Sequence, residues 1–140
     1  MKTKVIVLIA ASAVLLIAIA VTVFATDRRE PGDLVGPQEA YQMVREGKAI
    51  LVDVRDRASY EAGHLAGALL VPLHLVGENA DRLAGHKLTL ITYCSCPAEE
   101  TSTAAAMELM RRGVDDVLVL RGGIRGWIAA DLPLRVGSRP

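Results

Sequence analysis

Two cysteines separated by one residue are the side chains of this 140-residue chain best suited to covalent chemistry. They lie in the run Cys94-Ser95-Cys96-Pro97, between an apolar segment that ends at Tyr93 and a segment with helical character. A cysteine between a buried strand and a helix faces free backbone N–H groups and the positive end of the helix dipole, which favours thiolate over thiol. The amides of such a loop can also hold an anion or a terminal sulfur atom. The run therefore predicts a nucleophile that carries a transferable group, against the alternative of two buried and unreactive thiols.

The number and spacing of the cysteines argue against other uses. Two cysteines cannot form a disulfide framework, and a structural zinc site would need two more Cys or His ligands at suitable spacing. His74 and His86 have no partner at such a spacing. We therefore predict no metal and no cofactor. A copper or redox site built on Cys-x-Cys remains an alternative, because thiolates are soft ligands.

The segments that must position the cysteines alternate between strand and helix patterns. Four short, nearly continuous apolar runs have the pattern of strands buried on both faces of a parallel sheet. They are residues 49–54, 68–71, 88–93 and 117–120. Helices are predicted from Pro37 to near Gly47, over 58–62, irregularly before Gly85, over 100–112, and after Gly122-Gly123. This order predicts an α/β domain with right-handed crossovers and with its chemistry at the carboxyl ends of the strands.

The first 26 residues form a separate segment that is predicted to reach a membrane. Residues 5–25 are a run of 21 without charge, Pro or Gly, close to the roughly 20 that span a hydrocarbon core as a helix. We interpret the run as one uncleaved transmembrane anchor, because a signal-peptide core has only about 7 to 15 apolar residues. Cleavage after Ala25, which would make the domain secreted or periplasmic, is the alternative. Lysines before the span lean the prediction toward an extracytoplasmic domain.

The rest of the chain has the size of one domain. We divide it into a linker at 27–35, a domain at 36–135 and a tail at 136–140. Lys2 and Lys4 are two of the 16 basic residues, so the remainder carries 14 basic and 16 acidic residues, a net charge of 14 − 16 = −2. This balance gives no reason to expect nucleic-acid binding.

Several motifs in a fixed order resemble a rhodanese-like domain. The front-half matches are Leu51-Val-Asp-Val-Arg55, residues 60–68 and Val71-Pro-Leu73, and the back-half matches are Tyr93-Cys94, Ala104-Ala-Ala106 and residues 120–127. The resemblance covers about residues 36–135. It implies a single α/β domain in which a loop cysteine accepts a sulfane sulfur as a persulfide and passes it to a thiophilic acceptor.

The loop departs from the pattern of the family it resembles. Family loops usually run Cys-x-x-Gly-x-Arg-Ser, whereas this loop lacks both the Gly and the Arg. Counted from the strand, Cys94 takes the place of the nucleophile; counted back from Ser102, Cys96 takes it. We favour Cys94, partly because Pro97 removes the first amide that a loop centred on Cys96 could offer. Cys96 is then a second carrier or a resolving thiol.

The missing arginine also narrows the substrate. Phosphatases of related architecture use a Cys-x5-Arg loop to clamp phosphate, but Glu100 and Ser102 stand six residues after the two cysteines. Phosphatase activity is therefore not expected. Glu99 and Glu100 would repel thiosulfate, although acidic residues also suit a first helical turn. We expect weak thiosulfate turnover and a persulfide donor, with hydroxyls of Ser95, Thr101 and Ser102 lining the loop or capping the helix.

Six further positions match the family motifs and are assigned structural roles. His64 is expected to fix a loop rather than act as a base. Asp53 and Arg55 are expected to pair at the sheet edge, with Arg55 also a candidate substrate contact. Gly122-Gly123 is interpreted as a turn and Trp127 as a packing anchor.

The sequence thus predicts a membrane-anchored, rhodanese-like sulfurtransferase with Cys94 and Cys96 as its catalytic residues. Its predicted partners are a sulfur donor, either thiosulfate or a persulfide, a thiophilic acceptor and the membrane. The alternative is a non-catalytic module of the same fold that docks a membrane partner.

Overall fold

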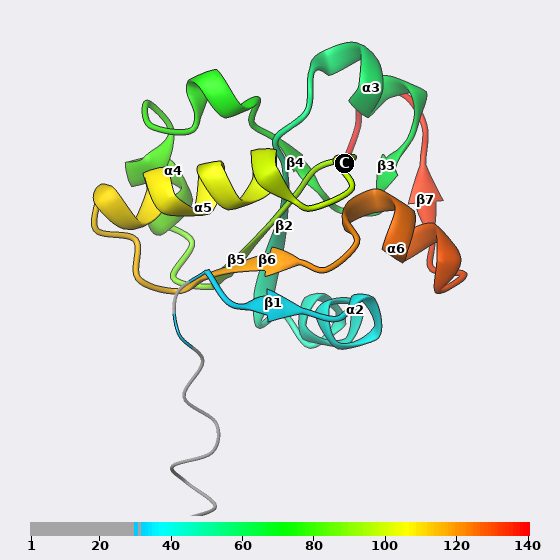
Figure 1. The fold of residues 1–140 in the computed structure, drawn as a ribbon, viewed down its shortest axis with the longest axis horizontal. Helices are drawn as coiled ribbons and strands as arrows, with labels where there is room; N and C mark the ends of the chain where they lie inside the picture. Colours follow the sequence, from blue (N-terminus) through cyan, green and yellow to red (C-terminus); the bar gives the residue numbers. More distant parts are fainter. Residues whose placement is uncertain (1–29, 31) are drawn as a thin grey trace, which may run out of the picture. The chain divides into compact units, whose positions relative to one another are not determined.

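The computed structural model describes residue 30 and residues 32–140 (Figure 1). The predicted membrane segment, residues 1–26, lies outside the described residues. In the part of the chain that is described, no helix is both long enough and apolar enough to cross a bilayer.

A five-stranded parallel sheet forms the centre of the fold, and four of its strands are those that the sequence predicts. Its strand order is β1 (Leu34–Val35), β6 (Val117–Leu120), β5 (Thr89–Tyr93), β2 (Ala49–Asp53) and β4 (Leu69–Leu70). The longest pairing joins β2 to β5, in register from Ala49 opposite Thr89 to Asp53 opposite Tyr93. From β2 the chain adds β4 on one side and β5 on the other. The order of the strands therefore reverses between β2 and β5, where the carboxyl ends of a parallel sheet leave a crevice.

Helices cover both faces of the sheet and bury two apolar clusters (Figure 1). Helices α4 (Ala80–Ala84) and α5 (Glu100–Arg111) cover one face, and α2 (Pro37–Arg45) and α6 (Gly123–Ala129) cover the other. Helix α5 buries Ala105, Ala106 and Leu109, a spacing of three to four residues that lies on one helix face. Its alanines let the helix approach the sheet closely, which sets the position of its first turn above β5.

Short elements that the sequence did not reveal close the ends of the fold. Strand β1 falls in the segment that we predicted as a linker, and it pairs in parallel with β6. Strands β3 (His64–Leu65) and β7 (Leu134–Arg135) form a separate antiparallel pair, which α3 (Arg57–Ala62) precedes. The irregular region before α4 contains only the short helix η1 (Leu73–Leu75). Strands of two residues leave no periodic pattern, so long-range pairing alone defines them.

The C-terminal tail is also held against the domain. The Gly137 amide donates a hydrogen bond to the Glu61 carbonyl at 2.8 Å, and the His64 Nε2 atom lies 2.9 Å from the Arg139 carbonyl oxygen. The predicted boundary at residue 136 therefore divides a segment whose contacts reach to residue 139.

Candidate active site

Both cysteines lie in one loop at the carboxyl edge of the sheet, between β5 and α5. Cys94 directly follows β5, and its side chain is buried, with 1% exposed. Cys96 is two residues farther along and is half-buried, and both thiols are free. Only Cys96 is therefore accessible to a molecule that approaches from solvent.

The two thiols contact each other and the first turn of α5. The Cys96 amide donates to Cys94 Sγ at 3.3 Å, and Ser102 Oγ lies 3.5 Å from the same sulfur. Cys96 Sγ lies 2.9 Å from Thr101 Oγ1. The two thiols are also close enough to affect each other's pKa. The Cys94 sulfur is thus enclosed by the loop, whereas Cys96 is only half-buried.

These surroundings move the pKa values of the two thiols in opposite directions. Burial raises the pKa of Cys94, and its hydrogen bond with Cys96 adds to that increase against the smaller effect of Ser102. Burial also acts to raise the pKa of Cys96, but hydrogen bonds from Cys94 and Thr101 outweigh it, so that pKa is lowered. Glu100 opposes this decrease through its charge. Cys96 is therefore the more acidic thiol of the pair, and Cys94 holds its proton more tightly.

The turn before α6 fixes the cysteine loop from the opposite side. Gly122 and Gly123 both have positive φ angles, of 72° and 51°. The Ile124 amide donates to the Cys94 carbonyl oxygen at 3.0 Å, and a Cβ atom on Gly123 would lie 2.2 Å from that oxygen. The Glu99 side chain accepts a hydrogen bond from the Gly122 amide at 2.5 Å. Gly122 therefore ends the turn and Gly123 begins α6, and the lack of a side chain at Gly123 allows the close approach that holds the loop.

Comparison with known proteins agrees with this arrangement. The model of the rhodanese-like domain matches residues 36–130. The chain belongs to the rhodanese-like domain family. The thiosulfate sulfurtransferase GlpE of Pseudomonas putida (strain GB-1) is 33% identical over 95 residues, 68% of this chain and 84% of the relative. The protein of the same name from Glaesserella parasuis serovar 5 is 28% identical over 103 residues, 74% of this chain and 93% of the relative.

A solved structure shares the fold of this chain. The crystal structure of the BH2092 protein from Bacillus halodurans matches with a TM-score of 0.67 at 26% identity. The match covers 75% of this chain and 77% of that chain.

The backbone of the loop bears on which cysteine takes the place of the rhodanese nucleophile. If Cys96 is aligned with the first position of Cys-x-x-Gly-x-Arg-Ser, Glu99 takes the place of Gly and Ser102 that of Ser. Glu99 has a φ of 54°, the left-handed conformation that glycine adopts most readily. The helix side of the loop therefore fits the register of Cys96, while the strand side fits that of Cys94, as the sequence indicates.

Asp53 and Arg55 form a separate buried network beside the loop. Arg55 binds the Asp53 carboxylate through Nε at 2.9 Å and through Nη2 at 2.6 Å, and its Nη2 also donates to the Gly63 carbonyl at 2.8 Å. The Tyr93 hydroxyl donates to Asp53 Oδ2 at 2.6 Å and accepts from the Leu65 amide at 3.2 Å. This network joins the ends of β2 and β5 to α3 and β3. Two of the donor nitrogens of Arg55 are used within it, so we assign Arg55 a structural role.

The other predicted residues also have identifiable contacts. His64 is buried, stacks on Tyr60 and has its Nδ1 atom 2.8 Å from the Tyr60 carbonyl oxygen, which suits the fixing of a loop. Trp127 is fully buried and donates to the Pro133 carbonyl at 3.1 Å. Ser95 is exposed at the tip of the loop. Among the described residues, no group of three or more His, Cys, Asp or Glu side chains could hold a metal ion.

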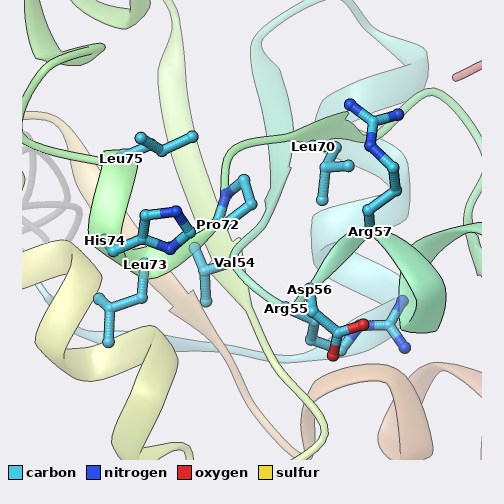
Figure 2. A pocket seen from close by; sticks show the side chains of 9 residues that line it. All are labelled: Val54, Arg55, Asp56, Arg57, Leu70, Pro72, Leu73, His74 and Leu75. Atoms are coloured by element: carbon cyan, nitrogen blue, oxygen red, sulfur yellow. The ribbon is translucent and has the colours of Figure 1, made fainter.

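A pocket of about 440 Å³ opens at the carboxyl ends of β2 and β4 (Figure 2). Figure 2 shows Arg57 of α3 on one side and His74 of η1 on the other, with apolar side chains between them. Its lining residues are Val54, Arg55, Asp56, Arg57, Leu70, Pro72, Leu73, His74 and Leu75. Val54 belongs to the same apolar cluster as Cys94, and Cys96 packs against that cluster. The pocket therefore shares an apolar cluster with the cysteines, but its lining residues do not belong to the cysteine loop. No motif in the sequence predicts it.

Sequence reasoning missed two residues that shape the site. The sequence predicts Glu99 only as an acidic residue that suits a first helical turn or repels an anion. Its side chain also links the cysteine loop to the turn before α6. The sequence predicts Tyr93 only as the residue before Cys94, yet its hydroxyl also donates a hydrogen bond to the Asp53 carboxylate. When Cys96 is aligned with the first position of the family pattern, Glu99 stands where the pattern has Gly. This mismatch is the signal in the sequence that points to Glu99.

The close approach of Gly123 leads to a first prediction. Replacing Gly123 with Ala places a methyl group against the Cys94 carbonyl, so we expect a loss of about 2 to 5 kcal/mol in the free energy of unfolding. Gly113→Ala is the matched control, because Gly113 also has a positive φ, of 82°, but faces open space. We expect the control to cost about 1 to 2 kcal/mol. Urea unfolding of the full-length variants measures both, and equal costs would contradict this account of the loop.

The contact of Thr101 with Cys96 leads to a second prediction. Thr101→Val removes the hydroxyl but keeps the shape, so the pKa of Cys96 should rise. The rate of Cys96 alkylation by iodoacetamide, measured against pH, should then reach its midpoint at a higher pH than in the wild type. Thr101→Ser keeps the hydroxyl and should stay close to the wild type. An unchanged midpoint in Thr101→Val would show that this contact does not stabilise the thiolate.

Proposed function

We propose that this chain is a sulfurtransferase that moves a sulfane sulfur through a persulfide on Cys96. The observation that carries the proposal is the unequal pair of thiols, in which Cys96 is accessible and has the lowered pKa. The sequence alone favours Cys94 as the nucleophile, and this proposal assigns that role to Cys96 instead. Burial of Cys94 is the reason, because a donor that approaches from solvent meets Cys96 first. The family and its curated thiosulfate sulfurtransferases support the class of reaction.

The transfer has two balanced steps. The Cys96 thiolate attacks the sulfane sulfur of the donor, the S–S bond of the donor breaks, and the leaving group departs as sulfite or a thiolate. The sulfur now stands on Cys96 as a persulfide anion. A thiophilic acceptor then attacks the terminal sulfur and restores the Cys96 thiolate. The first turn of α5 stabilises both anions through its hydrogen bonds and its dipole.

The charges near Cys96 favour a donor with little negative charge. Glu100 acts on the Cys96 thiolate as a like charge, and it would act in the same way on thiosulfate, a dianion. Arg55 is occupied by Asp53 and the Gly63 carbonyl. A persulfide group carries at most one negative charge at its reacting sulfurs, whereas thiosulfate concentrates two charges on one small ion. We therefore propose a persulfide as the preferred donor and weak turnover of thiosulfate.

Sulfur loading tests the proposed function. The full-length chain, incubated with glutathione persulfide and analysed by intact-mass spectrometry without reductant, should react at Cys96. Cys94→Ser keeps the attacking thiolate and should gain the mass of one sulfur atom, whereas Cys96→Ser should gain none. Thr103→Ala, an exposed position on α5, is the control and should behave as the wild type. If no variant reacts with any of several donors, the alternative of a non-catalytic docking module gains support.

We also propose that residues 5–25 anchor the chain in a membrane and that the domain lies on the extracytoplasmic side. The apolar run and the two lysines before it support this proposal. A reporter that is active only outside the cytoplasm, fused after Pro140, should be active, and the fusion should remain in the membrane fraction after a high-salt wash. A reporter active only in the cytoplasm is the matched control. Activity of that control would reverse the orientation, and release by salt would exclude an anchor.

A further inference from the structure

The proposed transfer does not use the thiol of Cys94. Cys94 is 1% exposed, so neither a donor nor an acceptor in solvent can reach its sulfur. Packing alone would be served by any small apolar side chain at this position. Its sulfur instead contacts the Cys96 amide and Ser102 Oγ, and the Cys96 thiol is close enough to raise its pKa. The reactive partner that the structure offers to Cys94 is therefore Cys96 itself.

The backbone between the cysteines is already bent toward such a reaction. Ser95 forms a bend, and across that bend the Cys96 amide donates a hydrogen bond to Cys94 Sγ at 3.3 Å. A disulfide needs Cα atoms about 4.4 to 6.8 Å apart, and residues i and i+2 come within that range only when the chain between them is bent. Ser95 is exposed and so is free of core packing that would resist a small adjustment.

We propose that Cys94 resolves the persulfide on Cys96, releasing sulfide and leaving a disulfide between Cys94 and Cys96. This inference rests on the proposed function and adds a second outcome to it, the reduction of a sulfane sulfur. Cys94 Sγ attacks Cys96 Sγ, and a new S–S bond forms between them. The bond to the terminal sulfur breaks, and that sulfur leaves with the electron pair and the Cys94 proton as HS⁻. The two cysteines are oxidised, and the sulfane sulfur is reduced to sulfide.

A dithiol reductant must then restore the pair. One thiolate of the reductant attacks the exposed Cys96 sulfur of the disulfide and frees Cys94. The second thiol of the reductant displaces Cys96 from the resulting mixed disulfide, so the reductant leaves as its own disulfide. Because Cys94 is buried, the exposed Cys96 is the sulfur that the reductant reaches. The chain would then convert persulfides to sulfide at the expense of a protein or small-molecule dithiol.

The test compares the fate of the sulfur in the full-length wild type and in Cys94→Ser. Each protein is mixed with glutathione persulfide without added thiol, sulfide is trapped with monobromobimane, and the intact mass is measured. The wild type should end two hydrogen masses lighter and release one sulfide per chain above a protein-free blank. Cys94→Ser should retain the added sulfur and release none. Addition of dithiothreitol should return the wild type to its starting mass, and Thr103→Ala should match it throughout.

The outcomes separate this inference from the function on which it rests. A wild type that keeps one added sulfur and releases no sulfide would overturn the resolving step and leave sulfur transfer intact. A wild type, Cys94→Ser and Cys94→Ala that neither gain sulfur nor release sulfide would overturn both. If Cys94→Ser does not fold, as judged by its near-ultraviolet circular dichroism, the wild-type masses and sulfide yield still decide between these results.

Discussion

The contact between Gly123 and the Cys94 carbonyl is the constraint on which the site depends. At this point the end of β5, the cysteine loop and the start of α6 meet, and the Ile124 amide bonds the same carbonyl oxygen. A side chain at residue 123 would separate them. The Glu99 carboxylate adds a second link to the same turn. The loop is thus anchored through its backbone, which leaves the two thiols free for hydrogen bonds and chemistry.

A second constraint lies in the buried charge beside the loop. Asp53 is fully buried, and its carboxylate accepts hydrogen bonds from both Arg55 and the Tyr93 hydroxyl. Removing one partner of a buried pair typically costs about 3 to 5 kcal/mol, because it leaves the other charge uncompensated. The network therefore locks the end of β2 to that of β5 and draws in α3 through the Gly63 carbonyl. It fixes one side of the crevice between these strands. It also engages Arg55, the arginine that the sequence offers as a substrate contact.

The sequence predicted the layers of the fold better than the details of the site. Apolar runs such as residues 49–53 and 89–93 are strands because both faces of the sheet are covered, and that pattern is visible in the sequence. Strands β1, β3 and β7 have two residues each, and only their distant partners define them. The unequal exposure of the two cysteines could not be predicted either, because it depends on how the loop turns. The contact between Glu99 and Gly122 joins residues 23 positions apart and leaves no local signal.

The missing loop arginine and the second cysteine can be understood together. A loop with an arginine can stabilise a thiolate and an anionic donor by charge. Here hydrogen bonds from Cys94 and Thr101 lower the pKa of Cys96 instead, against the charge of Glu100. Stabilisation by a neighbouring thiol has a consequence that an arginine would not have, because the donor of the hydrogen bond is itself a nucleophile. In the proposed transfer, the side chain that stabilises the Cys96 thiolate is also the thiol that attacks the Cys96 persulfide, which ties the chemistry of the loop to the redox state of both cysteines.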